Sequence, residues 1–194
     1  KRVNSVYGPA TLSYANKIFL DVTGRNDWSS TLPSGNNSFF YPSVSTSFIL
    51  SDLLRLPEQI SFAKLRASWA QVGNDTAPYK TAKYYNTSAF PGSASVSPTL
   101  YNARFKPEIS NSIEVGLDWR MFKQRFGLDL AFYNNITRNQ ILDVPMDQTT
   151  GYTKATMNSG KVRNRGIELQ LDGTPVKTKN FTWNSTFTWA KNYN

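Results

Sequence analysis

The sequence predicts an all-β fold in which about eight long antiparallel strands form one sector of a larger transmembrane β-barrel with long extracellular loops. Three observations support this prediction. Apolar and polar residues alternate over runs longer than those of soluble sheets, the polar positions hold many small residues, and short connections alternate with long ones. A soluble β-sandwich has no reason to sort its loops by strand parity, so a barrel wall is the better interpretation.

The alternation is clearest in residues 111–139, which read as two strands joined by a tight turn at residues 121–125. On one face the apolar side chains are Ile113, Val115, Leu117 and Trp119, followed after the turn by Phe126, Leu128, Leu130 and Phe132. A strand of a soluble sheet usually has ~5–6 residues, whereas a tilted strand that crosses a bilayer needs ~9–11. Both strands of this hairpin are of the longer kind.

The two faces of the predicted strands suit different surroundings. The polar face mixes Gly, Ser, Ala and Asn with a few charges, which suits the wet lumen of a wide barrel, while the other face suits lipid. We expect the lumen-facing residues to include Ser43, Ser45, Ser47, Glu114, Asp118, Arg120, Asp129 and Glu168. We expect the lipid-facing residues to include Val44, Phe48, Leu65, Trp69, Val115, Leu117, Trp119, Leu128, Leu130, Phe132, Leu169, Leu171, Trp183, Phe187 and Trp189.

The remaining strands follow the same period. Besides the central hairpin we expect strands at residues 10–14, 18–25, 40–50, 60–72, 160–172 and 181–189. A short helical turn is expected at residues 51–57, capped by Ser51 and ended by Pro57. Small residues at many inward positions would leave the lumen of an eight-stranded barrel unfilled, which favours a sector of a wider barrel.

The connections fall into two classes that alternate along the chain. The short ones are expected at residues 15–17, 121–125 and 173–180, with a moderate one at 51–59 in the same phase. The long ones are expected at residues 26–39, 73–107 and 143–159, and they are rich in Asn, Ser, Gly, Pro and aromatic residues. Outer-membrane barrels have this asymmetry, with short periplasmic turns and long outside loops.

Composition excludes several classes of function. The chain has no cysteine and no histidine, so thiolate metal sites, cysteine nucleophiles and Ser-His triads are ruled out. No acidic pair has the spacing of an evident catalytic cleft, and we expect no catalytic residue, no metal and no cofactor. The net charge of +9 is spread thinly and forms no basic patch on a nucleic-acid-binding module, so lipid head groups or acidic surfaces are the expected contacts.

Several motifs resemble the barrel of the SusC/RagA-type TonB-dependent transporters of Bacteroidetes outer membranes. They are GRNDWSSTLP at residues 24–33, FYPSVS at 40–45, KLRASWAQVGND at 64–75, KPE at 106–108, NSIEVGLD at 111–118 and NSGKVRNRGIE at 158–168. Their order and spacing agree with the family over nearly the whole chain. The resemblance implies a 22-stranded barrel with an amino-terminal plug and a TonB box.

The resemblance also implies partners. Members of this family import oligosaccharides, or in some cases peptides, together with a SusD-like surface lipoprotein that lids the barrel, using energy passed on by TonB. We therefore expect residues 1–194 to be part of a single barrel domain, with plug, TonB box and carboxy-terminal strands outside it, and a signal peptide on the precursor. The alternatives are a small complete barrel acting as an adhesin or structural porin, and a barrel enzyme.

Candidate ligand contacts are aromatic residues of the predicted loops. Sugar rings could stack on Trp28, Tyr79, Tyr84, Tyr85, Phe90 and Tyr101. The alternative is that these rings pack the loops or hold the lipoprotein lid, and the strand-end position of Trp28 suits an interfacial girdle.

Charged residues of the predicted lumen face form a second candidate group. Asp118 is expected opposite Asp129, a like-charge pair that needs a cation from Arg120 or from the plug. A catalytic dyad is the alternative interpretation of this pair. Lys177 and Lys179 are expected to meet lipid head groups or solvent on the periplasmic side.

Overall fold

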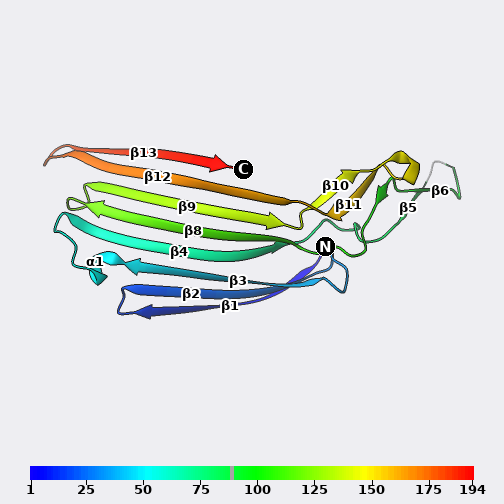
Figure 1. Ribbon diagram of the computed structural model, residues 1–194, viewed down its shortest axis with the longest axis horizontal. Coiled ribbons are helices and arrows are strands. Elements are labelled where there is room, and N and C mark those ends of the chain that lie inside the picture. Colours follow the sequence, from blue (N-terminus) through cyan, green and yellow to red (C-terminus); the bar gives the residue numbers. More distant parts are fainter. Residues whose placement is uncertain (88–89) are drawn as a thin grey trace.

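The computed structural model describes residues 1–87 and 90–194, and its main feature is one sheet of eight long antiparallel strands (Figure 1). These strands have 12 to 17 residues each. They are β1 (Val3–Tyr14), β2 (Ile18–Ser29), β3 (Ser38–Ile49), β4 (Ile60–Asn74), β8 (Glu108–Met121), β9 (Phe126–Arg138), β12 (Lys161–Lys177) and β13 (Thr182–Tyr193). The predicted number of crossing strands and their antiparallel pairing are confirmed.

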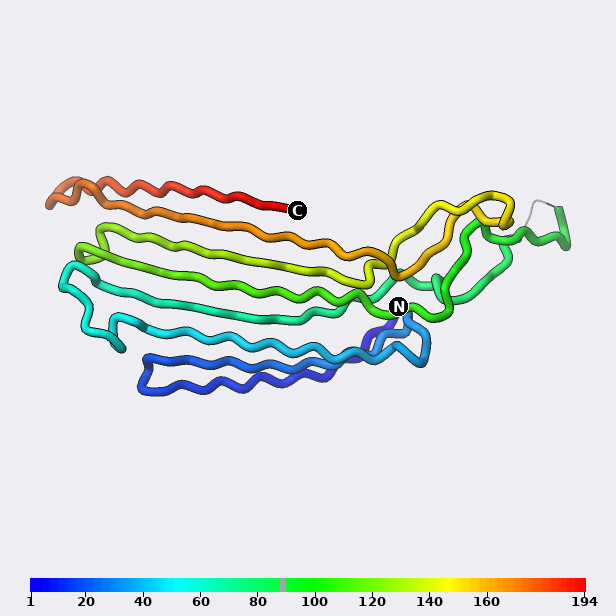
Figure 2. Tube along the Cα trace, viewed as in Figure 1, coloured from blue at the N-terminus to red at the C-terminus, as the bar shows by residue number. Residues whose placement is uncertain are grey.

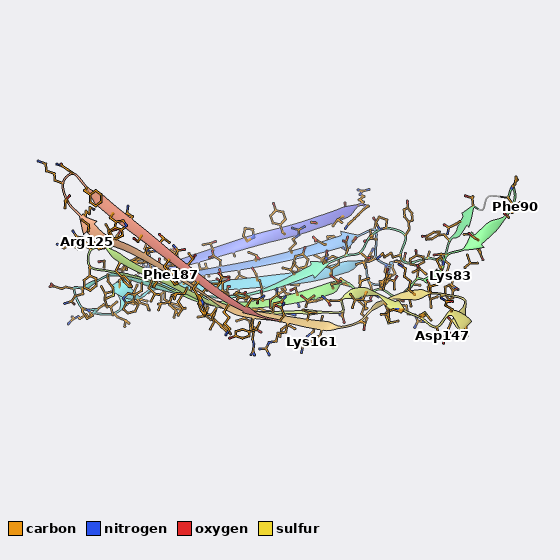
Figure 3. All side chains as sticks on the ribbon, turned by 90° about the horizontal axis from the view of Figure 1, so that it is seen from above. Lys83, Phe90, Arg125, Asp147, Lys161 and Phe187 are labelled. Carbon is orange, nitrogen blue, oxygen red and sulfur yellow. The ribbon has the colours of Figure 1, made fainter. Side chains whose placement is uncertain are left out.

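The sheet is an open sector rather than a closed small barrel. The strands follow one another in the order β1-β2-β3-β4-β8-β9-β12-β13, so β1 and β13 form the two edges (Figure 1). Seen from above, the sheet is curved and twisted, as a piece of a barrel wall must be (Figure 3). The expected alternative of a small complete barrel is therefore wrong for the described residues.

The cross-strand register separates the residues into the two predicted faces. Leu117 pairs with Leu65 and Leu130, and this row continues to Leu169 and Trp189. The preceding residue, Gly116, pairs with Arg66 and Ala131 on the opposite face. Every residue that we expected to face lipid lies on the first face, here called the apolar face, and every residue that we expected in the lumen lies on the second, the polar face.

The two classes of connection lie at opposite ends of the sheet. The turns at residues 15–17, 50–59, 122–125 and 178–181 lie at one end of the sheet, and the long connections lie at the other (Figure 2). Arg125 marks the turn end in Figure 3, whereas Lys83, Phe90 and Asp147 mark the loop end. The two predicted classes of connection therefore lie at opposite ends of the sheet, although the connection at residues 30–37, with 8 residues, is shorter than the one at 50–59, with 10, at the turn end.

Two predicted connections are shorter than expected because the strands run on. The loop predicted at 26–39 is reduced to residues 30–37, since Asn26 pairs with Phe40 and Trp28 with Ser38. The turn predicted at 173–180 is reduced to 178–181, because β12 continues past a bulge between Gly173 and Val176. That bulge accommodates Pro175, which cannot donate to a regular ladder.

The loop predicted at 143–159 is a hairpin of β10 (Ile141–Pro145) and β11 (Lys154–Asn158), closed by a 3-10 turn η1 (Gln148–Thr150). The Asp147 side chain caps this turn, and Gly151 leaves it with a φ of 81°. Residues 75–107 contain β5 (Tyr85–Thr87), β6 (Ala94–Val96) and β7 (Thr99–Leu100), while Ser88 and Ala89 of this predicted loop lie outside the described residues. Since β7 pairs with β11, the two long connections form one outer body.

The helical turn α1 (Leu50–Leu53) begins one residue earlier than predicted and ends at Leu53, so Pro57 does not end it as expected. Its N-cap is Ile49 rather than Ser51, because the last strand residue is held by a hydrogen bond from the Ile49 amide to the Lys17 carbonyl oxygen, 2.8 Å long. No helix among the described residues has the length and apolar character that crossing a membrane requires.

Candidate functional site

A chain of ion pairs runs across the polar face near the turn end. Asp118 lies directly opposite Asp129, as expected. The Arg120 guanidinium lies 2.8 Å from Asp118 and 3.2 Å from Asp172 on the next strand but one. The cation expected beside this acidic pair is therefore Arg120 for Asp118, and no catalytic dyad geometry results, because each carboxylate of the pair has its own arginine.

Arg66 is the second arginine, and sequence reasoning missed its partner. Its guanidinium makes two hydrogen bonds to Asp129, 3.0 and 3.3 Å long, and lies 3.7 Å from Glu114. Arg66 stands on β4 and Asp129 on β9, so the side chain reaches across the whole of β8. These charges are about one-quarter to one-half exposed, which leaves them accessible from the polar face.

Glycines make these crossings possible. A Cβ atom on Gly116 would lie 2.3 Å from Arg66 Nε, and one on Gly127 would lie 2.2 Å from Arg120 Nη1. Each arginine side chain thus passes over a glycine of the neighbouring strand, and its guanidinium then contacts a carboxylate two strands away, Asp129 for Arg66 and Asp172 for Arg120. Tyr133 repeats the arrangement over Gly166 to reach Asn192, with a hydrogen bond of 3.3 Å. A glycine opposite a long polar side chain is the sequence signal that would have identified these contacts.

A hollow of ≈ 370 Å³ lies on this polar face beside Arg66 and Asp129. Glu168, Gln170 and Thr188 complete its polar lining. Serines at the other half of the sheet pair across strands, for example Ser45 with Ser68, and Thr23 and Ser43 hydroxyls lie 2.6 Å apart. The face thus offers both charged and neutral hydrogen-bonding groups along the length of the wall.

The loop end is held by buried contacts. Phe105 is fully buried and packs with Leu32 and Phe39, while Tyr41 and Ile141 lie against this cluster. These residues come from β3, β10 and two long connections, so the cluster joins the outer body to the wall. Phe105 lies within the loop predicted at residues 73–107, and its central place in this cluster was not predicted.

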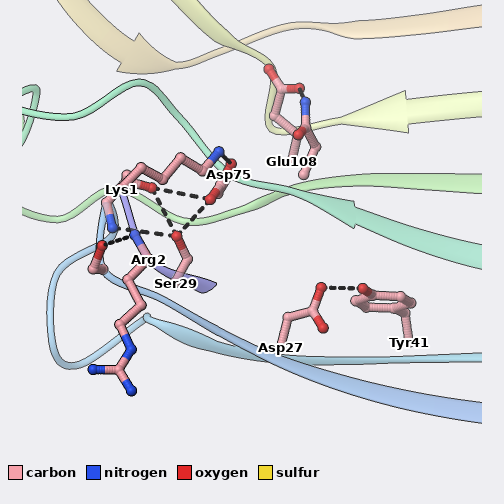
Figure 4. Close-up of polar contacts among 10 residues, drawn as sticks. Lys1, Arg2, Asp27, Ser29, Tyr41, Asp75 and Glu108 are labelled. Atoms are coloured by element: carbon pink, nitrogen blue, oxygen red, sulfur yellow. Dashed lines mark hydrogen bonds and ion pairs between the residues drawn. The ribbon is translucent and has the colours of Figure 1, made fainter. Parts of the chain in front are cut away.

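Hydrogen bonds to Asp75 tie three segments together near this cluster (Figure 4). Its carboxylate accepts from Ser29, at 2.5 Å, from Thr31, at 3.2 Å, and from the Lys1 ammonium. Burial works to raise the pKa of Asp75, but these hydrogen bonds outweigh burial and hold the pKa below that of an ordinary carboxyl group. Beside it, Tyr41 donates to Asp27, which also accepts from Arg25 at 2.8 Å.

Two further polar residues anchor the loop bases. Glu108 accepts from the Ile141 amide at 2.7 Å and from the Asn74 side chain at 3.3 Å. Asn158 bonds both backbone groups of Lys106, at 2.8 and 2.9 Å, and the Asn139 carbonyl oxygen at 2.9 Å. All of these anchors lie in or beside the motifs that carry the family resemblance, which therefore have a structural role at the loop bases.

The six aromatic residues expected to contact ligand lie in two places. Tyr79, Tyr84, Tyr85, Phe90 and Tyr101 all lie in the outer body, and four of them are exposed, with Tyr101 half-buried. Trp28 lies apart from them, near the loop end of β2. Its side chain is on the apolar face, the same face of β2 as Val22 and Gly24. The structure therefore brings Tyr79, Tyr84 and Tyr101 together, leaves Tyr85 and Phe90 elsewhere in the outer body (Figure 3), and separates Trp28 from all of them.

Comparison with known proteins identifies the family of the chain. The family model described as "TonB dependent receptor-like, beta-barrel" matches residues 1–194. The chain belongs to this family. It is 32% identical over its whole length to the TonB-dependent receptor P26 of Formosa agariphila, and 25% identical over 98% of its length to the TonB-dependent receptor SusC of Bacteroides thetaiotaomicron.

Solved structures agree with this assignment of the fold. The RagAB peptide transporter structure superposes on 98% of the chain with a TM-score of 0.88 and 23% sequence identity. The chain covers 22% of that solved chain and 20% of each of the two curated relatives, so it spans about a fifth of a SusC/RagA-type protein. Proteins of this family reside in the outer membrane and are receptors and transporters rather than enzymes.

Proposed function

We propose that this chain forms part of the barrel wall and outer loops of a TonB-dependent importer that carries oligosaccharides, or peptides, across the outer membrane together with a SusD-like lipoprotein. The polar face lines the lumen, the apolar face contacts lipid, and Trp28 lies in the interfacial girdle. Plug, TonB box and the remaining strands belong to other parts of the full-length protein.

One observation carries this proposal: the family match covers a wall with two chemically distinct faces and all its long connections at one end. A wall of this kind needs a polar, hydrated inner surface for a polar cargo and an apolar outer surface for the bilayer. The half-exposed ion pairs of Arg66 and Arg120 give the lumen side fixed charges that a plug or a passing ligand can contact.

Chemistry on the cargo is not part of the proposal. Import requires binding outside, closure by a lid and movement of the plug, and the acidic residues of the polar face are engaged by arginines rather than poised as an acid and base pair. The outer body of residues 75–107 and 141–158 is the surface that we assign to the cargo and to the lipoprotein.

The test is made on the full-length protein in its own cells. Deleting the gene should abolish growth on one class of oligosaccharide or peptide, and dissipating the proton-motive force should stop uptake of the labelled cargo in the intact strain. A tagged copy extracted in detergent should bring down one surface lipoprotein in equal amount. Uptake that persists after deletion, or that does not depend on TonB, would overturn the proposal.

A further inference from the structure

A cluster of tyrosines and lysines in the outer body plays no part in anchoring the loops. The rings of Tyr84 and Tyr101 are stacked, with centroids 5.5 Å apart and planes 24° apart, and their hydroxyl oxygens lie 2.9 Å apart. Next to this pair, a hollow of ≈ 370 Å³ is lined by Tyr79, Ala82 and Tyr84, and its walls are almost entirely apolar. The cluster therefore offers exposed ring faces beside an open space.

The surroundings of these rings are positively charged. Residues 75–107 contain four basic side chains, Lys80, Lys83, Arg104 and Lys106, but a single acidic one, Asp75. That carboxylate is engaged at the loop base by Lys1, Ser29 and Thr31. The Lys83 ammonium lies 5.5 Å from the centroid of the Tyr152 ring, which brings the neighbouring hairpin to the cluster.

The acidic residues of that hairpin are also engaged. Asp143 accepts from Lys154 at 2.8 Å and from Thr156 at 2.6 Å, and Asp147 accepts from the backbone and the hydroxyl of Thr149. The hydrogen bond with Tyr84, followed by other neighbours that include the Lys154 charge, lowers the pKa of Tyr101 against the opposing effect of burial. The carboxylates of both connections are thus engaged, whereas Lys83, which directly precedes Tyr84 in the chain, is exposed.

We propose that this cluster is a binding site for an acidic oligosaccharide, one that carries carboxylate or sulfate groups. This inference rests on the proposed import function. The C–H face of a pyranose ring suits the electron-rich face of an aromatic ring, and the lysines supply the opposite charge for its acidic substituents. A neutral sugar would use the rings but leave the surplus positive charge unmatched.

An extended peptide suits this surface less well. Peptides gain affinity from main-chain hydrogen bonds to a strand edge, and the strands nearest the cluster, β5, β6 and β7, have only two or three residues each. The surface on offer consists of ring faces, hydroxyl groups and ammonium groups. An acidic peptide is therefore the competing ligand that the experiment has to separate.

The experiment is calorimetry on the full-length protein in detergent. The ligands are a uronic-acid tetrasaccharide and a sulfated tetrasaccharide, each with its carboxyl-reduced or desulfated counterpart, and a tetraglutamate peptide. We expect one acidic tetrasaccharide to bind about tenfold or more tightly than its neutral counterpart, with affinity that falls as salt is raised. The tetrasaccharide that binds shows whether the acidic group of the ligand is a carboxylate or a sulfate.

Variants locate the site. Lys83→Gln should weaken binding of the acidic sugar several-fold and leave its neutral counterpart unaffected, whereas Tyr84→Ala should weaken both and Tyr84→Phe should retain binding. Lys179→Gln, in the turn at the opposite end of the sheet, is the matched control and should bind like the unmodified protein.

Three outcomes would overturn the acidic-sugar site: equal affinity for acidic and neutral sugars, preference for tetraglutamate, or no binding by any of the five ligands. None of these outcomes would contradict the proposed import function, which is contradicted only if TonB-dependent uptake is absent.

Discussion

The wall and the loop base of this molecule are held together in different ways. In the wall, backbone ladders carry the structure, and the side chains that cross it are half-exposed arginines lying over glycines. At the loop base, a fully buried Phe105 and the engaged carboxylate of Asp75 hold segments of different connections together. Single side chains therefore matter more for the position of the loops than for the integrity of the sheet.

This difference suits the division of labour that we propose. A wall whose stability comes from its backbone ladder can vary the side chains of its polar face without unfolding, whereas the outer body keeps its position only while its buried anchor is intact. Exposed ion pairs contribute about 0–1 kcal/mol each, so the ion pairs of Arg66 and Arg120 shape the polar face more than they stabilise the sheet.

The largest expected effect is that of Phe105→Ala. Removing a fully buried phenylalanine costs about 3–5 kcal/mol, and because Phe105 joins the outer body to the wall, we expect local release of residues 75–107 while the barrel stays folded. Hydrogen exchange of the full-length protein should show faster exchange in these loops and unchanged exchange in β4 and β8. Phe90→Ala, at an exposed ring, is the control. Loss of the whole barrel would contradict the separation of loop base and wall.

Gly116→Ala should have the next largest effect. The new methyl group would meet Arg66 Nε at 2.3 Å and also its Cγ at 2.9 Å, so the Arg66 side chain has to move. The overpacking costs about 1–3 kcal/mol, most of it strain in the packing, because the lost ion pair with Asp129 contributes little. Gly127→Ala should cost less, since the nearest atom there is the mobile end of Arg120. Thermal unfolding in detergent measures both, and Gly8→Ala, where the space is open, is the control. If Arg66→Ala fails to relieve Gly116→Ala, the clash is not its cause.

Sequence periodicity predicted the wall well because strand geometry is local. Alternation with period 2 assigned both faces, and counting from the tight turn placed Asp118 opposite Asp129. It did not predict that Arg66 crosses β8 to reach Asp129, since that contact depends on the missing side chain of Gly116 and on a neighbour two strands away. Such diagonal contacts become visible only when the register of three strands is known.

The loop end of the molecule was harder to predict because its structure depends on distant residues. The segment before Ser29 has the polar composition of a loop, yet it pairs as a strand because its partner on β3 continues the ladder. The strands β10 and β11 surround a capped turn whose sequence reads as loop. They are held by Glu108 of β8, which accepts from the Ile141 amide, and by Asn158, the last residue of β11, which bonds Lys106 and Asn139. The motifs pointed to these residues without indicating that their role is to anchor.

Acidification should loosen the loop base by a smaller amount. Because the folded-state pKa of Asp75 lies below its unfolded value, the stabilisation from its hydrogen bonds is complete at neutral pH and is lost as the pH falls through that lowered pKa. We expect a cost of about 1 kcal/mol, seen as faster proteolysis of residues 30–37 and 75–87 at pH 3 than at pH 7 with an acid-active protease. Asp75→Asn should abolish most of this pH dependence, and a variant that retains it would point to another carboxylate.

The smallest expected effect concerns the exposed pair of Asp143 and Lys154 on the outer hairpin. The hydrogen bond from Lys154, followed by that from Thr156, lowers the pKa of Asp143, but the two charged side chains are 37% and 46% exposed, so solvent screens their attraction. Asp143→Asn retains a group that can accept from Thr156 and removes only the charge. Hydrogen exchange of β10 and β11 in single and double variants with Lys154→Gln should give a coupling of about 0.2–1 kcal/mol that shrinks as salt rises. A coupling that is larger, or indifferent to salt, would mean that this hairpin is held by buried charges like those of the loop base rather than by its backbone ladder.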